Sequence, residues 1–189
     1  MNVPLTHAAE GLERRAFTVR DVIRMVEMGV LGRDERFELI GGEIVPMSPK
    51  GIRHETIKQW LNEKLVRQLP DNLQTIPETT FYLSEDTFIE PDFVIYPRES
   101  GLKNLSPGTC LLAIEIADSS LHYDLGRKAE LYAEFGIDEV WVINAATLET
   151  RIHREPDNGR YASVTDIARG ASMETARVPG LVVTLKDVA

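Results

Sequence analysis

The chain has 189 residues, 43% of them hydrophobic and 27% charged, and carries a formal net charge of −9. That length suits one domain with a substantial core, and no apolar run approaches the roughly 20 residues that a membrane-spanning helix needs. The single cysteine, Cys110, excludes an internal disulfide and a cysteine-rich metal cluster. The acidic balance also disfavours tight, sequence-independent binding to nucleic acid, because such binding depends on Lys and Arg.

The N-terminal part of the chain offers few structural signals. It shows no basic segment followed by an apolar one, so we expect no export signal and a cytoplasmic location. Residues 1–17 lack periodicity and are expected to be loosely ordered. Thr18 is then predicted to be the N-cap of a short amphipathic helix that ends at Gly29, with Asp21 as its capping-box partner.

Residues 36–47 contain two short alternating runs around Gly41 and Gly42, a pattern typical of a tight β-hairpin. Glu38 and Glu43 fall within this hairpin. They are either solvated carboxylates of the two strands or auxiliary acidic groups near a metal, and the sequence leaves both interpretations open.

A second helix is predicted over residues 52–69, with an apolar stripe that begins at Ile57. His54 lies three residues before Ile57 and therefore borders the buried side of this helix. A histidine in such a position is either a hydrogen-bonded structural group or a catalyst.

Strands are predicted over residues 73–83, 88–96 and 109–117. Pro91 makes the second of these an edge strand or marks a strand start or a bulge, because proline cannot donate a main-chain hydrogen bond. The third is apolar on both faces, as expected of a central strand.

A helix predicted over residues 124–135 separates the third strand from another buried strand at 138–144. A strand, a helix and a strand within about 35 residues have the length of a parallel crossover. A hairpin over 147–154 and 161–165 and a short strand after Gly180 complete the chain. Residues 1–189 are predicted to form a single α/β domain.

Three ionisable residues stand in apolar surroundings, where such groups are rare without a partner or a task. Asp92 and Glu115 lie in neighbouring strand patterns, and Lys128 lies in the apolar stripe of the following helix. If the two strands pair, their carboxylates meet, and a bound cation would relieve the repulsion. Mg²⁺ suits such a site because it accepts few protein oxygens and keeps room for water and a phosphate.

Lys128 shares its helical face with four apolar residues three, four or seven positions away, namely Leu125, Leu131, Tyr132 and Phe135. Its ammonium is therefore expected near Glu115, where it could stabilise negative charge that develops on a phosphate. The alternative is a lysine whose stem covers apolar surface while its head meets solvent. Together the three residues indicate metal-assisted hydrolysis of a phosphodiester.

Four segments occur in a fixed order: RFELIGGEI at 36–44, EPDFVI at 90–95, AIEIADSS at 113–120 and DLGRKAELYAEFGIDEVWVI at 124–143. Together they resemble the Uma-type restriction endonucleases, a bacterial family of the PD-(D/E)XK nuclease superfamily. The resemblance implies a restriction-endonuclease-like core, in which a mixed central β-sheet is flanked by helices, here with an N-terminal helix and hairpin.

By this resemblance, Pro91-Asp92 is the PD element and Glu115 is the acidic residue of the second half-motif. Residue 117, where the motif usually has lysine, is alanine. The resemblance instead places the lysine on the following helix, as Lys128.

Further motifs of the family make Glu38 or Glu43 and His54 secondary site candidates. Asp118 stands where the family usually has Ser-Pro-Ser or a similar segment, and it adds a carboxylate near the site. Asp118 either helps to hold a metal or caps the next helix.

The leading hypothesis is an Mg²⁺-dependent DNA endonuclease, with Mn²⁺ as a substitute, in which Asp92 and Glu115 hold the metal and Lys128 assists. A homodimer is expected, because two symmetric sites can cut both strands of a duplex. The alternative is a non-catalytic member of the same fold that binds nucleic acid or a protein. Hydrolysis of another kind of phosphodiester would use the same site.

Overall fold

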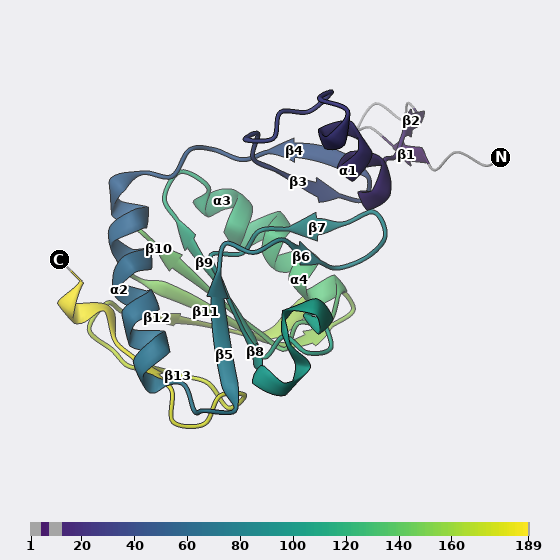
Figure 1. The fold of residues 1–189 in the computed structure, drawn as a ribbon. Coiled ribbons are helices and arrows are strands. Elements are labelled where there is room, and N and C mark those ends of the chain that lie inside the picture. The colour runs from purple at the N-terminus through teal and green to yellow at the C-terminus, as the bar shows by residue number, and fades with distance from the viewer. Residues whose placement is uncertain (1–4, 8–12, 189) are drawn as a thin grey trace. The chain divides into compact units, whose positions relative to one another are not determined.

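The computed structural model describes residues 5–7 and 13–188 (Figure 1). The chain forms two compact units, one of residues 1–47 and 80–90 and the other of residues 48–79 and 91–189. The interpretation of 1–189 as a single domain stays a prediction. Part of the segment expected to be loosely ordered, at 1–4 and 8–12, lies outside the described residues.

The first unit begins with two short paired strands and a capped helix. Strands β1 (Leu5–His7) and β2 (Glu13–Arg15) are antiparallel, and helix α1 spans Val19–Glu27. The Thr18 hydroxyl accepts a hydrogen bond from the Asp21 N–H at 3.1 Å, and the Asp21 carboxylate accepts one from the Thr18 N–H at 3.0 Å. The predicted capping box is therefore confirmed.

A four-stranded antiparallel sheet completes the first unit, in the order β4-β3-β7-β6. Its strands are β3 (Phe37–Ile40), β4 (Glu43–Pro46), β6 (Phe81–Tyr82) and β7 (Phe88–Ile89). The predicted hairpin is confirmed, and Gly42 at its turn has a φ of 80°. A Cβ atom there would lie 2.5 Å from the Cβ of Ala16, so this turn requires glycine in both conformation and space.

The second unit is built on a six-stranded mixed sheet in the order β12-β11-β10-β9-β8-β5. Strands β9 and β10 are parallel, as the predicted crossover requires, and the other neighbours are antiparallel. The strands are β5 (Leu73–Pro77), β8 (Phe93–Pro97), β9 (Leu112–Ala117), β10 (Glu139–Asn144), β11 (Thr150–Asp157) and β12 (Arg160–Ile167). The predicted class, a mixed central sheet flanked by helices, is confirmed.

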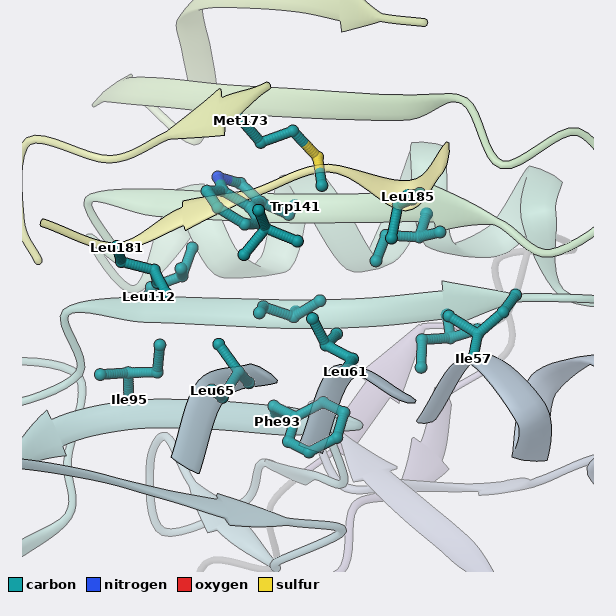
Figure 2. Close-up of a cluster of buried hydrophobic side chains, with 14 of the residues drawn as sticks. Ile57, Leu61, Leu65, Phe93, Ile95, Leu112, Trp141, Met173, Leu181 and Leu185 are labelled. Carbon is teal, nitrogen blue, oxygen red and sulfur yellow. The ribbon is translucent and has the colours of Figure 1, made fainter. Parts of the chain in front are cut away.

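Helix α2 (Ile52–Gln68) covers one face of this sheet. Its buried side chains Ile57, Leu61 and Leu65 pack in one cluster with apolar side chains of the strands, as Figure 2 shows. Among the latter are Phe93, Ile95, Leu112 and Trp141. Ile114 and Ile116 of β9 also belong to this cluster. Because side chains alternate along a strand, Glu115 between them points to the opposite face of the sheet.

The opposite face receives a helical segment with a change of pitch. It consists of α3 (Leu121–Tyr123), a π-helical turn η3 (Asp124–Lys128) and α4 (Ala129–Glu134). The helix predicted over 124–135 is therefore present, but its first part is wider than an α-helix. Such π-helical turns are rare and occur frequently at functional sites.

The C-terminal segment adds to the core on the α2 side. It contains β13 (Met173–Glu174), β14 (Val182–Val183) and the 3₁₀ turn η4 (Leu185–Asp187). Met173, Leu181 and Leu185 lie in the same cluster as Trp141 (Figure 2). Two further 3₁₀ turns, η1 (Arg98–Ser100) and η2 (Leu102–Asn104), lie between β8 and β9.

The prediction of two continuous strands, at 73–83 and 88–96, is wrong. The first is divided into β5 and β6 and the second into β7 and β8, and each pair belongs to two different sheets. Glu78 has a φ of 50°, which no extended strand accommodates, and Pro91 lacks the N–H that a strand pairing needs. Asp92 consequently lies just before the first residue of β8, at its N-terminal end.

Cys110 is buried, and burial raises the pKa of its thiol to about 12. It is therefore an inert core residue. Within the described part of the chain, no helix is both long and apolar enough to cross a membrane.

Because of His153 on β11, we expect the protein to lose stability in acid. Burial and the charge of Arg151 lower the pKa of this histidine to about 4, and its Nε2 atom has no hydrogen-bond partner among the residues that the structure describes. Because the unfolded chain binds this proton near pH 6.5, the stabilisation is complete above that pH and is lost as the pH falls toward 4. Between pH 7 and pH 5 we expect wild type to lose on the order of 1 kcal/mol more than His153→Leu.

Urea unfolding at both pH values measures this difference, and His122→Leu, at an exposed position, serves as the control. Equal pH dependence in wild type and His153→Leu would contradict the prediction.

Candidate active site

Asp92 is held at the start of β8 by three hydrogen-bond donors. Its Oδ2 accepts the main-chain N–H of Ile116 at 2.7 Å. Its Oδ1 accepts the Lys50 ammonium at 2.7 Å and His54 Nε2 at 2.9 Å. The carboxylate is thus fixed to β9 on one side and to the start of α2 on the other.

The charge state of Asp92 follows from these donors. Burial raises the pKa of this carboxyl group, but the hydrogen bonds and charges of His54 and Lys50 outweigh burial and hold it at about 2. Asp92 is 4% exposed. A buried carboxylate that stays ionised at neutral pH is the form that binds a hard cation.

Glu115 occupies the middle of β9, whose residues are all buried. Its Oε1 accepts the hydroxyl of Tyr132 at 2.5 Å and lies 3.0 Å from the Lys128 ammonium. Both partners come from the helical segment on the face opposite α2. The sequence prediction that Lys128 approaches Glu115 is therefore matched by the observed ion pair.

Lys128 is the last residue of the π-helical turn, and its side chain is 4% exposed. Its ammonium is therefore inside the protein, which rules out the alternative of a lysine head in solvent. The buried residue one turn before it is Asp124, whereas Leu125 is only half-buried. The extra residue of the π-helical turn explains this difference from the regular helical spacing.

Asp92 and Glu115 lie directly beyond the last paired residues of β8 and β9. That last pair is Phe93 with Ile114, so one further step along the antiparallel register would set Asp92 opposite Glu115. In the β5–β8 pair Pro77 faces Phe93, and the same step sets Glu78 opposite Asp92. The Glu78 N–H donates to the Asp92 carbonyl at 3.2 Å, in agreement with this placement.

Lys50 and Glu78 belong to the surroundings of Asp92, and sequence reasoning missed both. The Lys50 ammonium lies 2.5 Å from the Glu78 carboxylate as well as 2.7 Å from that of Asp92. Neither residue interrupts an apolar run, so no pattern marked them. The sequence offers one signal for Lys50: it lies four residues before His54, just ahead of the helix in whose first turn His54 lies.

The secondary candidates divide between the two units. His54 is buried and contacts Asp92, so the structure joins it to the site residues. Glu38 is buried in the first unit, where it accepts the Glu90 N–H at 3.0 Å, and Glu43 is exposed there at the start of β4. An auxiliary role for Glu38 or Glu43 stays a prediction.

Asp118 follows β9 and lies close to the first residues of α2. A Cβ atom on Gly51, the N-cap of that helix, would lie 2.5 Å from Asp118 Oδ2. A carboxylate in this position interacts favourably with the positive end of the helix dipole. Asp118 Oδ2 therefore lies at the N-terminal end of α2, and its role in holding a metal or capping the next helix stays a prediction.

The donor set fits a hydrated hard cation. Among residues 5–7 and 13–188, no three His, Cys, Asp or Glu side chains form a group that could hold a metal by themselves. Mg²⁺ commonly takes only one or two carboxylates and fills its shell with water and phosphate. The three donors on Asp92 use three of about four acceptor positions of a carboxylate, so Oδ2 retains one.

Comparison with known proteins identifies a matching family and a solved structure of similar fold. The family model described as "Uma2: Putative restriction endonuclease" matches residues 22–186. A crystal structure described as a putative nuclease belonging to DUF820, from Anabaena variabilis ATCC 29413, superposes with a TM-score of 0.72 at 13% identity, over 91% of this chain and 97% of that one. At this identity the likeness establishes the fold.

A second solved structure, a cryo-EM structure of a DrdV–DNA complex, covers 58% of this chain and 9% of that chain. Its TM-score of 0.36 at 15% identity is too low to carry an argument. Comparison with proteins of curated function gave no match. The family model spans most of the chain, including all the site residues described above, and the chain therefore belongs to the Uma2 family of restriction-endonuclease-like proteins.

Proposed function

We propose that this protein is an Mg²⁺-dependent DNA endonuclease in which Asp92 and Glu115 hold the metal and Lys128 assists the reaction. Membership of the Uma2 family supports a nuclease-like function, and restriction-endonuclease-like enzymes generally use a divalent metal. The choice of Mg²⁺, with Mn²⁺ as a substitute, rests on the all-oxygen donor set.

One observation supports the proposal: Asp92, just before β8, and Glu115, in the middle of the adjacent strand β9, are both buried, and the buried Lys128 pairs with Glu115. Asp92 is bound to the main chain of Ile116, the neighbour of Glu115, at 2.7 Å. Lys128 lies 3.0 Å from Glu115. Burying such groups is unfavourable for folding unless they are paired. A catalytic role would explain why the chain has all three at buried positions.

The side chains have distinct tasks in hydrolysis of a phosphodiester. A bound divalent cation would polarise the phosphoryl oxygen and lower the pKa of a bound water. Lys128 donates a hydrogen bond from Nζ to the phosphate oxygen that gains negative charge. Tyr132 and His54 keep the carboxylates of Glu115 and Asp92 in place through their hydrogen bonds, at 2.5 Å and 2.9 Å.

DNA is the proposed substrate on the strength of the family description. The net charge of −9 argues for binding in which metal and a few basic groups offset phosphate repulsion, rather than for a broad basic surface. A homodimer stays a prediction, supported by the need to cut two strands.

Plasmid nicking by the purified protein tests the proposal. With Mg²⁺ present, wild type should nick supercoiled DNA, and Asp92→Asn should reduce the rate by at least about 10²-fold. Chelation with EDTA should abolish the activity of wild type. Absence of metal-dependent nicking above the Asp92→Asn level, across DNA and RNA substrates, would refute the enzyme and favour the non-catalytic alternative.

A further inference from the structure

Lys50 lies between two carboxylates next to the proposed metal site. Its ammonium contacts Glu78 Oε1 at 2.5 Å and Asp92 Oδ1 at 2.7 Å, and its side chain is 12% exposed. Because one nitrogen contacts both oxygens, Lys50 occupies the position of a cation shared by the two acidic groups. No other ammonium or guanidinium group of the described residues contacts Asp92.

The neighbouring carboxylates explain why a positive charge is needed here. The Glu78 N–H donates to the Asp92 carbonyl, and Asp92 accepts the N–H of Ile116, the neighbour of Glu115. Neighbouring carboxylates repel one another in a partly buried site. Lys50 balances Glu78 and Asp92, and Lys128 balances Glu115.

A divalent cation that binds Asp92 would bring a second positive charge to the same carboxylate. Asp92 Oδ1 already receives both Lys50 and His54, so a metal would bind the remaining position on Oδ2, on the same carboxylate as the Lys50 ammonium. Two cations a few ångströms apart in a buried site repel each other strongly. Metal binding and the Lys50–Asp92 contact therefore oppose each other.

We propose that Lys50 is an internal counter-ion that competes with the divalent cation for Asp92 and so sets the metal affinity of the site. The inference rests on the proposed metal site at Asp92 and Glu115. In the absence of metal the ammonium bridges Asp92 and Glu78, and on metal binding it leaves Asp92 while Glu78 retains it. Lys50 then acts as a positioning residue, since it holds Asp92 in place until the metal arrives.

The chain supplies a matched control in Lys58. This lysine lies 2.9 Å from the same Glu78 carboxylate and 2.8 Å from Glu55, and its side chain is 17% exposed. It belongs to α2 and does not contact Asp92. Replacing Lys58 removes the same charge from the same neighbourhood without releasing Asp92.

Calorimetric titration with Mn²⁺ alone, at constant pH and without DNA, tests the competition. Lys50→Met should bind Mn²⁺ about tenfold more tightly than wild type, because the fraction of protein with an accessible Asp92 rises. Lys58→Met should stay within about twofold of wild type, since it loses only a partly exposed ion pair. Equal or weaker binding by Lys50→Met would overturn the inference.

Failure of the proposed function gives a different result. If wild type does not bind Mn²⁺ but Lys50→Met does, the competition is supported and the metal dependence of wild type is refuted. If neither protein binds Mn²⁺, the inference is overturned as well.

A measurement on wild type covers the case in which Lys50→Met does not fold. Reductive methylation with mass-spectrometric readout reports how accessible each lysine amine is. Saturating Mn²⁺ should increase the labelling of Lys50 several-fold and leave that of Lys58 unchanged. Equal labelling of Lys50 with and without Mn²⁺ would overturn the inference.

Discussion

Replacement of Lys128 by methionine is expected to slow metal-dependent DNA cleavage by about 10²- to 10³-fold, because the charge that develops on the phosphate loses its donor. The variant should also be less stable by about 3 kcal/mol, since Glu115 then remains buried without the ammonium that lies 3.0 Å from it. Single-turnover cleavage and urea unfolding measure the two effects.

A double variant separates catalysis from folding at this ion pair. Glu115→Gln together with Lys128→Met removes both charges, so stability should largely return while cleavage stays abolished. Arg127→Met is the matched control, because Arg127 is the neighbouring cation but pairs with Glu134 on the surface. Cleavage by folded Lys128→Met within about threefold of wild type would exclude Lys128 from the reaction.

The largest effect on stability is expected at Glu139, whose side chain is buried in β10. Its Oε1 accepts Trp141 Nε1 at 2.7 Å and Arg154 Nη2 at 2.8 Å, and its Oε2 accepts the Thr175 hydroxyl at 2.6 Å. Glu139→Ala leaves Trp141 Nε1 and the Thr175 hydroxyl without this acceptor, while Arg154 keeps its hydrogen bond to the Glu174 carbonyl. The free energy of unfolding should fall by about 3–5 kcal/mol.

Urea unfolding tests this expectation against an exposed ion pair in the same sheet. Arg151 and Asp166 form two hydrogen bonds across β11 and β12, at 2.7 and 2.9 Å, but both side chains are exposed. Asp166→Ala should therefore cost no more than about 1 kcal/mol. Similar losses in the two variants would show that Glu139 does not join the C-terminal segment to the sheet.

Sequence reasoning succeeded where local patterns determine the structure. The Thr18 capping box, the apolar stripe of α2 and the apolar run of β9 each follow from residues close together in the chain, and all three are confirmed. Sequence reasoning failed at Glu78, where a predicted strand is divided between two sheets, whereas the strand start that Pro91 allowed agrees with β8 beginning at Phe93. A left-handed conformation at a glutamate depends on tertiary contacts and cannot be predicted from the residue type.

The same distinction applies to the candidate site. Asp92, Glu115 and Lys128 were recognisable because each interrupts an apolar pattern, and the structure places all three in buried, paired positions. Lys50 and Glu78 lie in polar segments, so their approach to Asp92 depends on strand pairing between residues far apart in the chain. The π-helical turn at Asp124–Lys128 was also not predictable, because its residues suit an ordinary helix.

A crystal of the wild-type protein grown with Mn²⁺ tests the central claim most directly. We expect one anomalous-scattering peak bound by carboxylate oxygens of Asp92 and Glu115, with the Lys50 ammonium moved away from Asp92. A fully occupied peak elsewhere, or no peak at millimolar Mn²⁺ with Lys50 still on Asp92, would contradict it.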